Sequence, residues 1–68
     1  MKFYISFGQV HTHSINGITI DKDCIVELES ETKRGAHEKA MEIFDGVFHN
    51  VYEKLPNMDY FPRGVIKI

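Results

Sequence analysis

Two histidines separated by one residue, His11 and His13, are the side chains whose types and spacing best suit chemistry in this sequence. Alternate residues of a β-strand face the same side, so their Cβ atoms would stand about 6.5–7 Å apart. Two imidazoles at that spacing can share one divalent metal ion, although a catalytic or structural site needs at least a third ligand. The residues that could supply this ligand are Asp21, Asp23, Cys24, His37 and His49. Alternatively, the two histidines contact a partner molecule, or they are half-exposed strand residues that hydrogen-bond to neighbouring groups.

The segment YFPRG, residues 60–64, is a second candidate because proline and glycine flank Arg63 in a predicted turn. A guanidinium group held there could bind a phosphate or a carboxylate through two parallel hydrogen bonds. In the structural alternative, Tyr60 and Phe61 close the open end of a sheet, and Arg63 stacks on an aromatic ring or pairs with a carboxylate.

Two further groups of charged residues could bind a partner. Lys33 and Arg34 open the predicted helix, where acidic residues are usually preferred, so they could attract an anion or pair with Glu29 and Glu31. Acidic residues at alternate positions could form a stripe for a basic partner, or simply a solvated strand face. These residues are Asp21, Asp23, Glu27, Glu29 and Glu31.

The first half of the chain predicts strands. Residues 2–7 alternate between two faces and are rich in aromatic and β-branched side chains. Asn16-Gly17 between β-competent flanks predicts a hairpin that pairs Ile15 with Ile18 and His13 with Ile20, with a long loop as the alternative. Residues 23–30 predict the next strand. Its inward residues would be Cys24, Val26 and Leu28, and its outward residues Ile25, Glu27 and Glu29.

The second half predicts a helix followed by two strands. Ser30 or Thr32 caps the helix, and Gly46 lies just past its end. The inward face of this helix is expected to carry Ala36, Ala40, Ile43 and Phe44. Residues 47–54 predict a strand, residues 55–64 a loop, and residues 65–68 the last strand. The expected fold is therefore one α+β domain, residues 1–68: an antiparallel sheet of four to five strands in β-β-α-β-β order, with one helix packed on one face.

The small size of the chain bounds its stability. A 68-residue chain buries only about 60% of the surface that it exposes when unfolded, and such a core rarely supplies more than about 3–5 kcal/mol. Cys24 is the only cysteine, which excludes an internal disulfide and fits a reducing cytoplasm. Either the core is efficient, or a divalent metal ion or a second copy of the chain adds stability; of these we favour a homodimer, and no other cofactor is indicated.

The composition excludes several classes of protein. A net charge of −2 argues against a protein whose main task is to neutralise a nucleic-acid backbone. No apolar run reaches the ~18–20 residues of a membrane span, and the N-terminus does not have the pattern of a signal peptide. Signals for an enzyme are few, because the sequence lacks a phosphate-binding glycine loop, a Cys/His zinc quartet and a nucleophile elbow.

The segments SFGQVHTHSING, DKDC and YFPRG stand in this order along the chain. Together they resemble a family of short proteins encoded by bacteriophages and prophages, over nearly the whole length from Phe3 to Ile66. In that family an Ala-Arg pair is expected in the helix, where this chain has Ala36-His37. The resemblance implies a viral origin, a cytoplasmic location in a bacterial host and an accessory role, and it implies no catalytic residues.

These observations lead to one main hypothesis and two alternatives. A small sheet with one helix has little internal volume but a full open face and edges for recognition. We therefore expect binding to a host protein, as a modulator or inhibitor. The surfaces expected to bind are His11, His13, Tyr60, Phe61, Arg63, Lys33 and Arg34. The alternatives are nucleic-acid binding, with exposed tyrosines as stacking platforms, and a metal-binding module or metal-dependent enzyme that uses His11 and His13.

Overall fold

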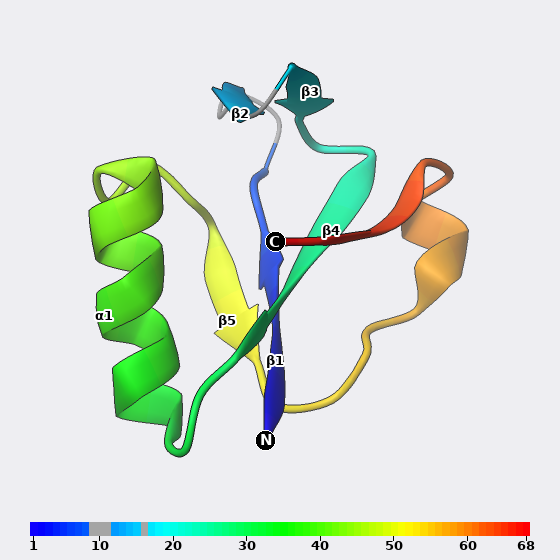
Figure 1. Cartoon of the computed structure of the whole chain (residues 1–68). Helices are drawn as coiled ribbons and strands as arrows, with labels where there is room; N and C mark the ends of the chain where they lie inside the picture. Colours follow the sequence, from blue (N-terminus) through cyan, green and yellow to red (C-terminus); the bar gives the residue numbers. More distant parts are fainter. Residues whose placement is uncertain (9–11, 16) are drawn as a thin grey trace.

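One α-helix and six strands build the molecule in the computed structural model, which describes residues 1–8, 12–15 and 17–68 (Figure 1). The α+β class is confirmed, while the chain order contains more strands before the helix than the predicted β-β-α-β-β. The elements in chain order are β1 (Lys2–Ser6), β2 (His13–Ile15), β3 (Ile18–Ile20), β4 (Cys24–Glu29), α1 (Lys33–Phe44), β5 (Asn50–Tyr52), a short 3₁₀-helix η1 (Met58–Tyr60) and β6 (Gly64–Lys67).

The main sheet has the strand order β5-β1-β4-β6 and is mixed. β1 runs antiparallel to both β4 and β5, whereas β6 runs parallel to β4. The prediction of a purely antiparallel sheet is therefore wrong. The physical reason is the connection over residues 53–63, which carries the chain from the β5 edge to the opposite edge. A parallel arrangement needs a long crossover of this kind.

A separate two-stranded sheet contains the predicted hairpin. β2 and β3 pair antiparallel with Ile15 opposite Ile18 and His13 opposite Ile20, so the predicted register is confirmed. Gly17 has φ 78°, the left-handed conformation that a tight turn requires and that glycine adopts without strain. Asn16, the other predicted turn residue, lies outside the described residues.

The helix α1 begins and ends at specific capping groups. The Thr32 side chain accepts a hydrogen bond from the Gly35 backbone at 2.9 Å, while the Ser30 hydroxyl accepts one from the Thr32 backbone. Of the two predicted caps, Thr32 is therefore the N-cap. At the other end, Asp45 takes a left-handed conformation, and Gly46 follows as predicted, with its N–H bonded to the Met41 carbonyl.

The main core lies between α1 and one face of the sheet. The predicted inward residues of β4 are buried there, as are three of the four predicted inward residues of α1; Ile43 is instead 43% exposed. The buried residues Ala36, Ala40 and Phe44 recur every four residues and form one narrow face of the helix. Ile43 lies at the margin of this face. The buried cluster consists of Phe3, Ile5, Phe7, Ile20, Cys24, Val26, Leu28, Ala36, Ala40, Phe44 and Val51.

The face of the sheet opposite α1 is partly covered, as the burial of Ile25 on that face shows. This residue is fully buried but lies outside the cluster beneath α1, so the prediction that it faces solvent is wrong. β6 pairs on the outer side of β4 and makes β4 an interior strand, with Val65 opposite Ile25. In Figure 1, α1 lies on one side of the sheet and the crossover over residues 53–63 lies on the other.

Candidate binding site

His13, one of the two predicted metal ligands, is a packing residue. Its ring lies 5.6 Å from the Phe7 ring and 5.0 Å from the Phe44 ring, measured between centroids. Its Nε2 atom hydrogen-bonds to the Val47 backbone carbonyl. This arrangement corresponds to the structural alternative for His13, while His11 lies outside the described residues. Within residues 1–8, 12–15 and 17–68, no group of three or more His, Cys, Asp or Glu side chains is placed to hold a metal ion.

Arg63 connects the last strand to the hairpin. Its guanidinium group donates to the Thr19 carbonyl at 2.6 Å and lies 3.3 Å from the Asp21 carboxylate, and its backbone N–H donates to the Asp23 carbonyl at 2.8 Å. These contacts match the structural alternative, in which Arg63 pairs with a carboxylate. They also break up the predicted acidic stripe, because β4 begins only at Cys24 and Asp21 lies in the preceding turn.

The two aromatic residues before Pro62 behave differently from one another. Tyr60 ends η1 and is 74% exposed, so the expectation that it closes the end of the sheet is wrong. Phe61, just past the end of η1, is half-buried, and its backbone N–H donates to the carbonyl of Met58, the first residue of η1. The 3₁₀ turn, which the sequence predicts only as loop, explains the difference because it directs successive side chains to different sides.

Lys33 and Arg34 stand exposed in the first turn of α1. Arg34 lies 3.5 Å from Glu38 one turn along the helix, and not beside Glu29 or Glu31 as the structural alternative predicts. Its side chain is 90% exposed, which makes this ion pair a weak contributor to stability.

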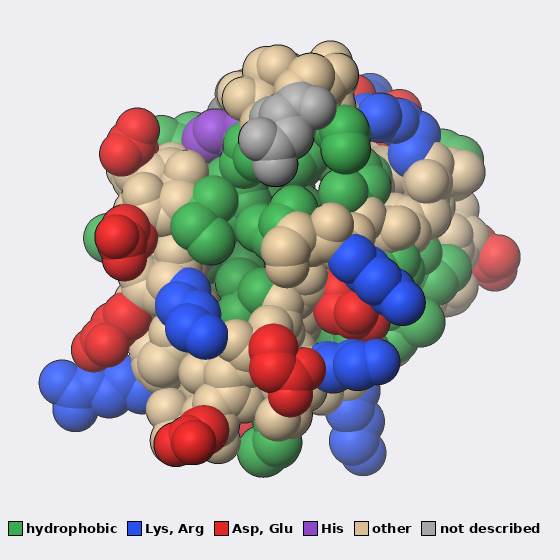
Figure 2. All heavy atoms as spheres, viewed as in Figure 1, with side chains coloured by type: hydrophobic (Ala, Val, Ile, Leu, Met, Phe, Trp, Pro, Cys, Tyr) green, Lys and Arg blue, Asp and Glu red, His purple; other side chains and the backbone are tan. Residues whose placement is uncertain are grey.

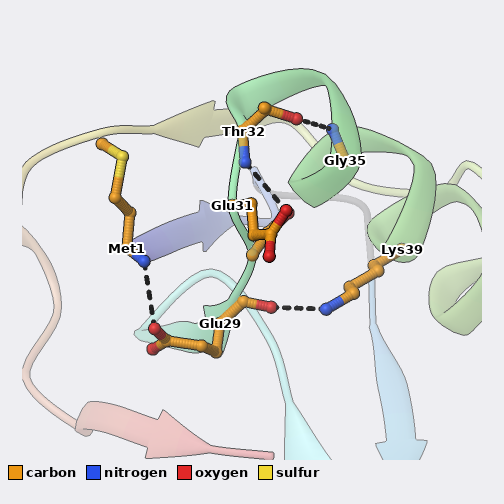
Figure 3. Close-up of a pocket in the computed structure, with 7 residues that line it drawn as sticks. Met1, Glu29, Glu31, Thr32, Gly35 and Lys39 are labelled. Atoms are coloured by element: carbon orange, nitrogen blue, oxygen red, sulfur yellow. Dashed lines mark hydrogen bonds and ion pairs between the residues drawn. The ribbon is translucent and has the colours of Figure 1, made fainter.

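A hollow of about 640 Å³ lies beside the start of α1 (Figure 3). Glu29 bonds to two of the other lining residues: its carboxylate accepts from the Met1 ammonium at 3.0 Å, and its carbonyl accepts from Lys39 at 2.6 Å. The Thr32 hydroxyl is occupied by the Gly35 backbone. Most of the polar groups drawn in Figure 3 therefore bond to one another, and Glu31 is an exposed carboxylate at the rim that solvent can reach.

A second hollow, of about 260 Å³, lies on the side of the sheet away from α1 and is the stronger candidate. Four segments far apart in the sequence supply its walls: the end of β1, the turn before β4, the start and end of β5, and the crossover. The lining residues are Ser6, Gly8, Lys22, Asp23, His49, Tyr52 and Phe61. We call this hollow the Ser6 cavity.

Backbone geometry brings the walls of the Ser6 cavity together. The His49 N–H donates to the Ser6 carbonyl at 2.7 Å, which fixes the chain leading into β5 against the end of β1. Gly8 takes φ 64°, and a Cβ atom there would stand 3.5 Å from the His49 Cβ. Tyr52 pairs with Tyr4 across the strands, so both phenol rings project from the face opposite α1.

Ser6 gives the cavity its chemical character. The residue is 3% exposed, and its hydroxyl oxygen has no hydrogen-bond partner among the residues that the structure describes. Burying a hydroxyl without a partner costs free energy, so such groups in folded proteins call for an explanation. Ser6, His49 and Asp23 are the residue types of a hydrolase triad, but a nucleophilic serine needs a hydrogen-bonded base. Among the described residues the Ser6 hydroxyl has no such hydrogen bond, so what it offers to a bound molecule is a buried polar group without a partner.

Cys24 is not part of this cavity. Burial raises the pKa of its thiol above the ordinary value, with a hydrogen bond to the Asp21 backbone acting in the opposite direction. A buried thiol with a raised pKa is a poor nucleophile, and Cys24 acts as a small hydrophobic residue, as the sequence suggests.

Of the lining residues, Phe61 is among the predicted binding residues, Asp23 belongs to the predicted acidic stripe, and Asp23 and His49 are two of the possible metal ligands. The sequence did contain a signal at Ser6, because a serine in a strand of aromatic and branched residues marks a polar position on an otherwise apolar element. No such signal marks Lys22, and nothing in the sequence places His49 and Asp23 beside Ser6, because tertiary contacts bring them together.

The comparisons with known proteins leave the family of the chain open. No protein-family model, curated protein or solved structure matches this sequence or its fold. In the described part of the chain, none of the helices combines the length and apolar character needed to cross a bilayer.

Proposed function

We propose that the protein is a small bacteriophage accessory protein that binds a host protein in the bacterial cytoplasm, through the sheet face opposite α1. The Ser6 cavity is the single observation that carries this proposal, because it combines aromatic walls with a buried hydroxyl that has no partner in the described part of the chain. Protein interfaces obtain most of their binding energy where a few side chains of one partner fill such pockets.

The surroundings of the cavity suit a protein partner. Tyr4 and Tyr52 are half-buried on this face, and Val65 is 37% exposed at its β6 edge. Tyrosine is enriched in protein interfaces because its ring gives contact area and its hydroxyl gives a hydrogen bond. Charged residues of both signs lie beside these tyrosines on the same face. Tyr4 is paired with Glu27 on β4, and Glu27 is paired with Lys67 on β6.

The charge distribution disfavours the nucleic-acid alternative. Binding to a phosphate backbone requires a cluster of cations with few competing carboxylates. In Figure 2, Lys, Arg, Asp and Glu side chains are interspersed, and hydrophobic side chains gather in the middle of the view. At the cavity itself, Lys22 is followed directly by Asp23.

Affinity capture with two matched variants tests the proposal. Val65→Lys changes an aliphatic residue at the edge of the proposed face, and Ile43→Lys changes one of similar exposure on α1 (37% and 43%). Each purified variant would be immobilised and exposed to a lysate of the host bacterium, with nuclease-treated lysate in parallel.

We expect the wild-type protein and Ile43→Lys to retain the same host protein, and Val65→Lys to lose it by about tenfold or more. Circular dichroism and thermal unfolding would confirm that both variants fold. Three results would overturn the proposal: both variants lose the host protein equally, nuclease treatment abolishes its capture, or the wild-type protein captures none. Light scattering of the wild type would reveal a second copy of the chain as the occupant of this face instead.

A further inference from the structure

We infer that the Ser6 cavity accepts one tyrosine side chain of the partner, with its phenol hydroxyl bonded to the Ser6 hydroxyl. This inference deepens the proposed function and rests on it for the identity of the partner as a protein. It starts from three properties of the cavity: its volume, its aromatic walls and its buried oxygen.

The volume selects the size of the guest. The cavity measures about 260 Å³. This is below the ~300–1,000 Å³ of pockets that enclose drug-sized ligands, yet it exceeds the ~150 Å³ cavity known to bind benzene in another protein. A single substituted aromatic ring would fill this hollow, whereas a nucleotide or a large metabolite would extend beyond its walls into solvent.

The walls select the class of the guest. Phe61 and Tyr52 present aromatic rings from the crossover and from β5, and His49 adds an imidazole. Aromatic rings pack favourably against one another in offset or edge-to-face contacts. Lys22 and Asp23 stand at the same cavity with opposite charges, so a charged guest would meet both attraction and repulsion there. A neutral aromatic ring is therefore favoured over a carboxylate, a phosphate or an ammonium group.

The buried hydroxyl distinguishes tyrosine from phenylalanine. A phenol can donate to the Ser6 oxygen or accept from it, whereas a phenyl ring would leave that group without a partner. Sites built to hydrogen-bond a hydroxyl discriminate strongly against analogues that lack it. The Ser6 oxygen is shielded from solvent in the unbound chain. Binding therefore includes a side-chain rearrangement at the cavity, a common event at protein interfaces.

Side-chain analogues test the inference without the partner. The full ¹⁵N-labelled chain would be titrated with p-cresol, the analogue of tyrosine, and with toluene, the analogue of phenylalanine, and amide shifts would be followed by NMR. We expect shifts centred on Ser6, Gly8 and Tyr52, with p-cresol binding at least about fivefold more tightly than toluene. Adenosine and 3-methylindole serve as competitors of other chemical classes.

Ser6→Ala should bring the two affinities within about twofold of each other while toluene binding persists, and the exposed Ser14→Ala should leave the preference intact. Because the Ser6 hydroxyl has no partner among the described residues, Ser6→Ala should not lower the melting temperature. Equal binding of p-cresol and toluene to the wild type, tighter binding of adenosine or 3-methylindole, shifts outside the cavity, or no binding at all would overturn the inference. Any of these results would leave the capture experiment with Val65→Lys and Ile43→Lys standing, so the two failures can be told apart.

Discussion

Replacing Arg63 by alanine should remove a large part of the stability of this protein. The guanidinium group makes a 2.6 Å hydrogen bond to the Thr19 carbonyl and an ion pair with Asp21. The side chain of Arg63 is 39% exposed and that of Asp21 is 30% exposed. A hydrogen bond from a charged donor contributes about 1.5–3 kcal/mol, and a partly exposed ion pair about 0–1 kcal/mol. After allowance for solvent screening, we expect the free energy of unfolding to fall by about 2 kcal/mol.

Urea unfolding followed by circular dichroism measures this loss. For a chain of this size, a slope near ~1 kcal/mol per M converts it into a midpoint lowered by about 2 M. The melting temperature would fall by about 8–16 °C. Arg34→Ala is the matched control, because its ion pair with Glu38 is exposed and should contribute less than about 0.5 kcal/mol. If Arg63→Ala shifts the midpoint no more than Arg34→Ala does, the structural role of Arg63 is refuted and its predicted role in partner binding is restored.

Three further predictions concern His13 and Cys24. His13→Ala should lower the free energy of unfolding by about 2–3 kcal/mol because it removes a ring packed between Phe7 and Phe44, whereas Thr12→Ala, at an exposed position, should change the urea midpoint little. Zinc should leave the melting temperature unchanged, since Nε2 of His13 already bonds to a carbonyl; an increase that a chelator reverses would revive the metal hypothesis. Burial raises the pKa of the Cys24 thiol, so the folded chain keeps a proton that the unfolded chain loses above about pH 8.5. The free energy of unfolding should therefore fall as the pH rises beyond that value, and more steeply in the wild type than in Cys24→Ala; parallel pH profiles would contradict this prediction.

Local signals in the sequence predicted the parts of the fold that depend on neighbouring residues. Asn16-Gly17 was sufficient for the register of the hairpin, because a two-residue turn leaves one way to pair Ile15 with Ile18. The end of α1 shortly before Gly46 was equally predictable, since left-handed residues just past the helix satisfy its last carbonyl groups.

The direction of β6 could not be predicted in the same way. Residues 53–63 contain prolines, an asparagine and charged residues that fit a short return to the neighbouring strand as well as a crossover to the far edge. The error at Ile25 follows from this one, because an alternating pattern indicates an exposed face only when no chain segment crosses it.

The candidate site depends on the same crossover. Ser6, His49 and Phe61 are distant in the sequence and lie together only because β5 and β6 occupy opposite edges of the sheet. Conversely, the predicted binding residues His13 and Arg63 are held by the Val47 and Thr19 carbonyls. The sequence shows that these two side chains can hydrogen-bond. Tertiary contacts decide that their partners are backbone carbonyls of this chain and not groups of another molecule.

Site-specific photo-crosslinking tests most directly whether binding takes place on the sheet face opposite α1. A photoreactive phenylalanine analogue would replace Val65 on that face or Ile43 on the exposed surface of α1, and each protein would be irradiated in host lysate and analysed by mass spectrometry. The account predicts a covalent adduct with one host protein from position 65 and none from position 43. The same adduct from both positions, an adduct from position 43 alone, or a nucleic-acid adduct from position 65 would contradict it.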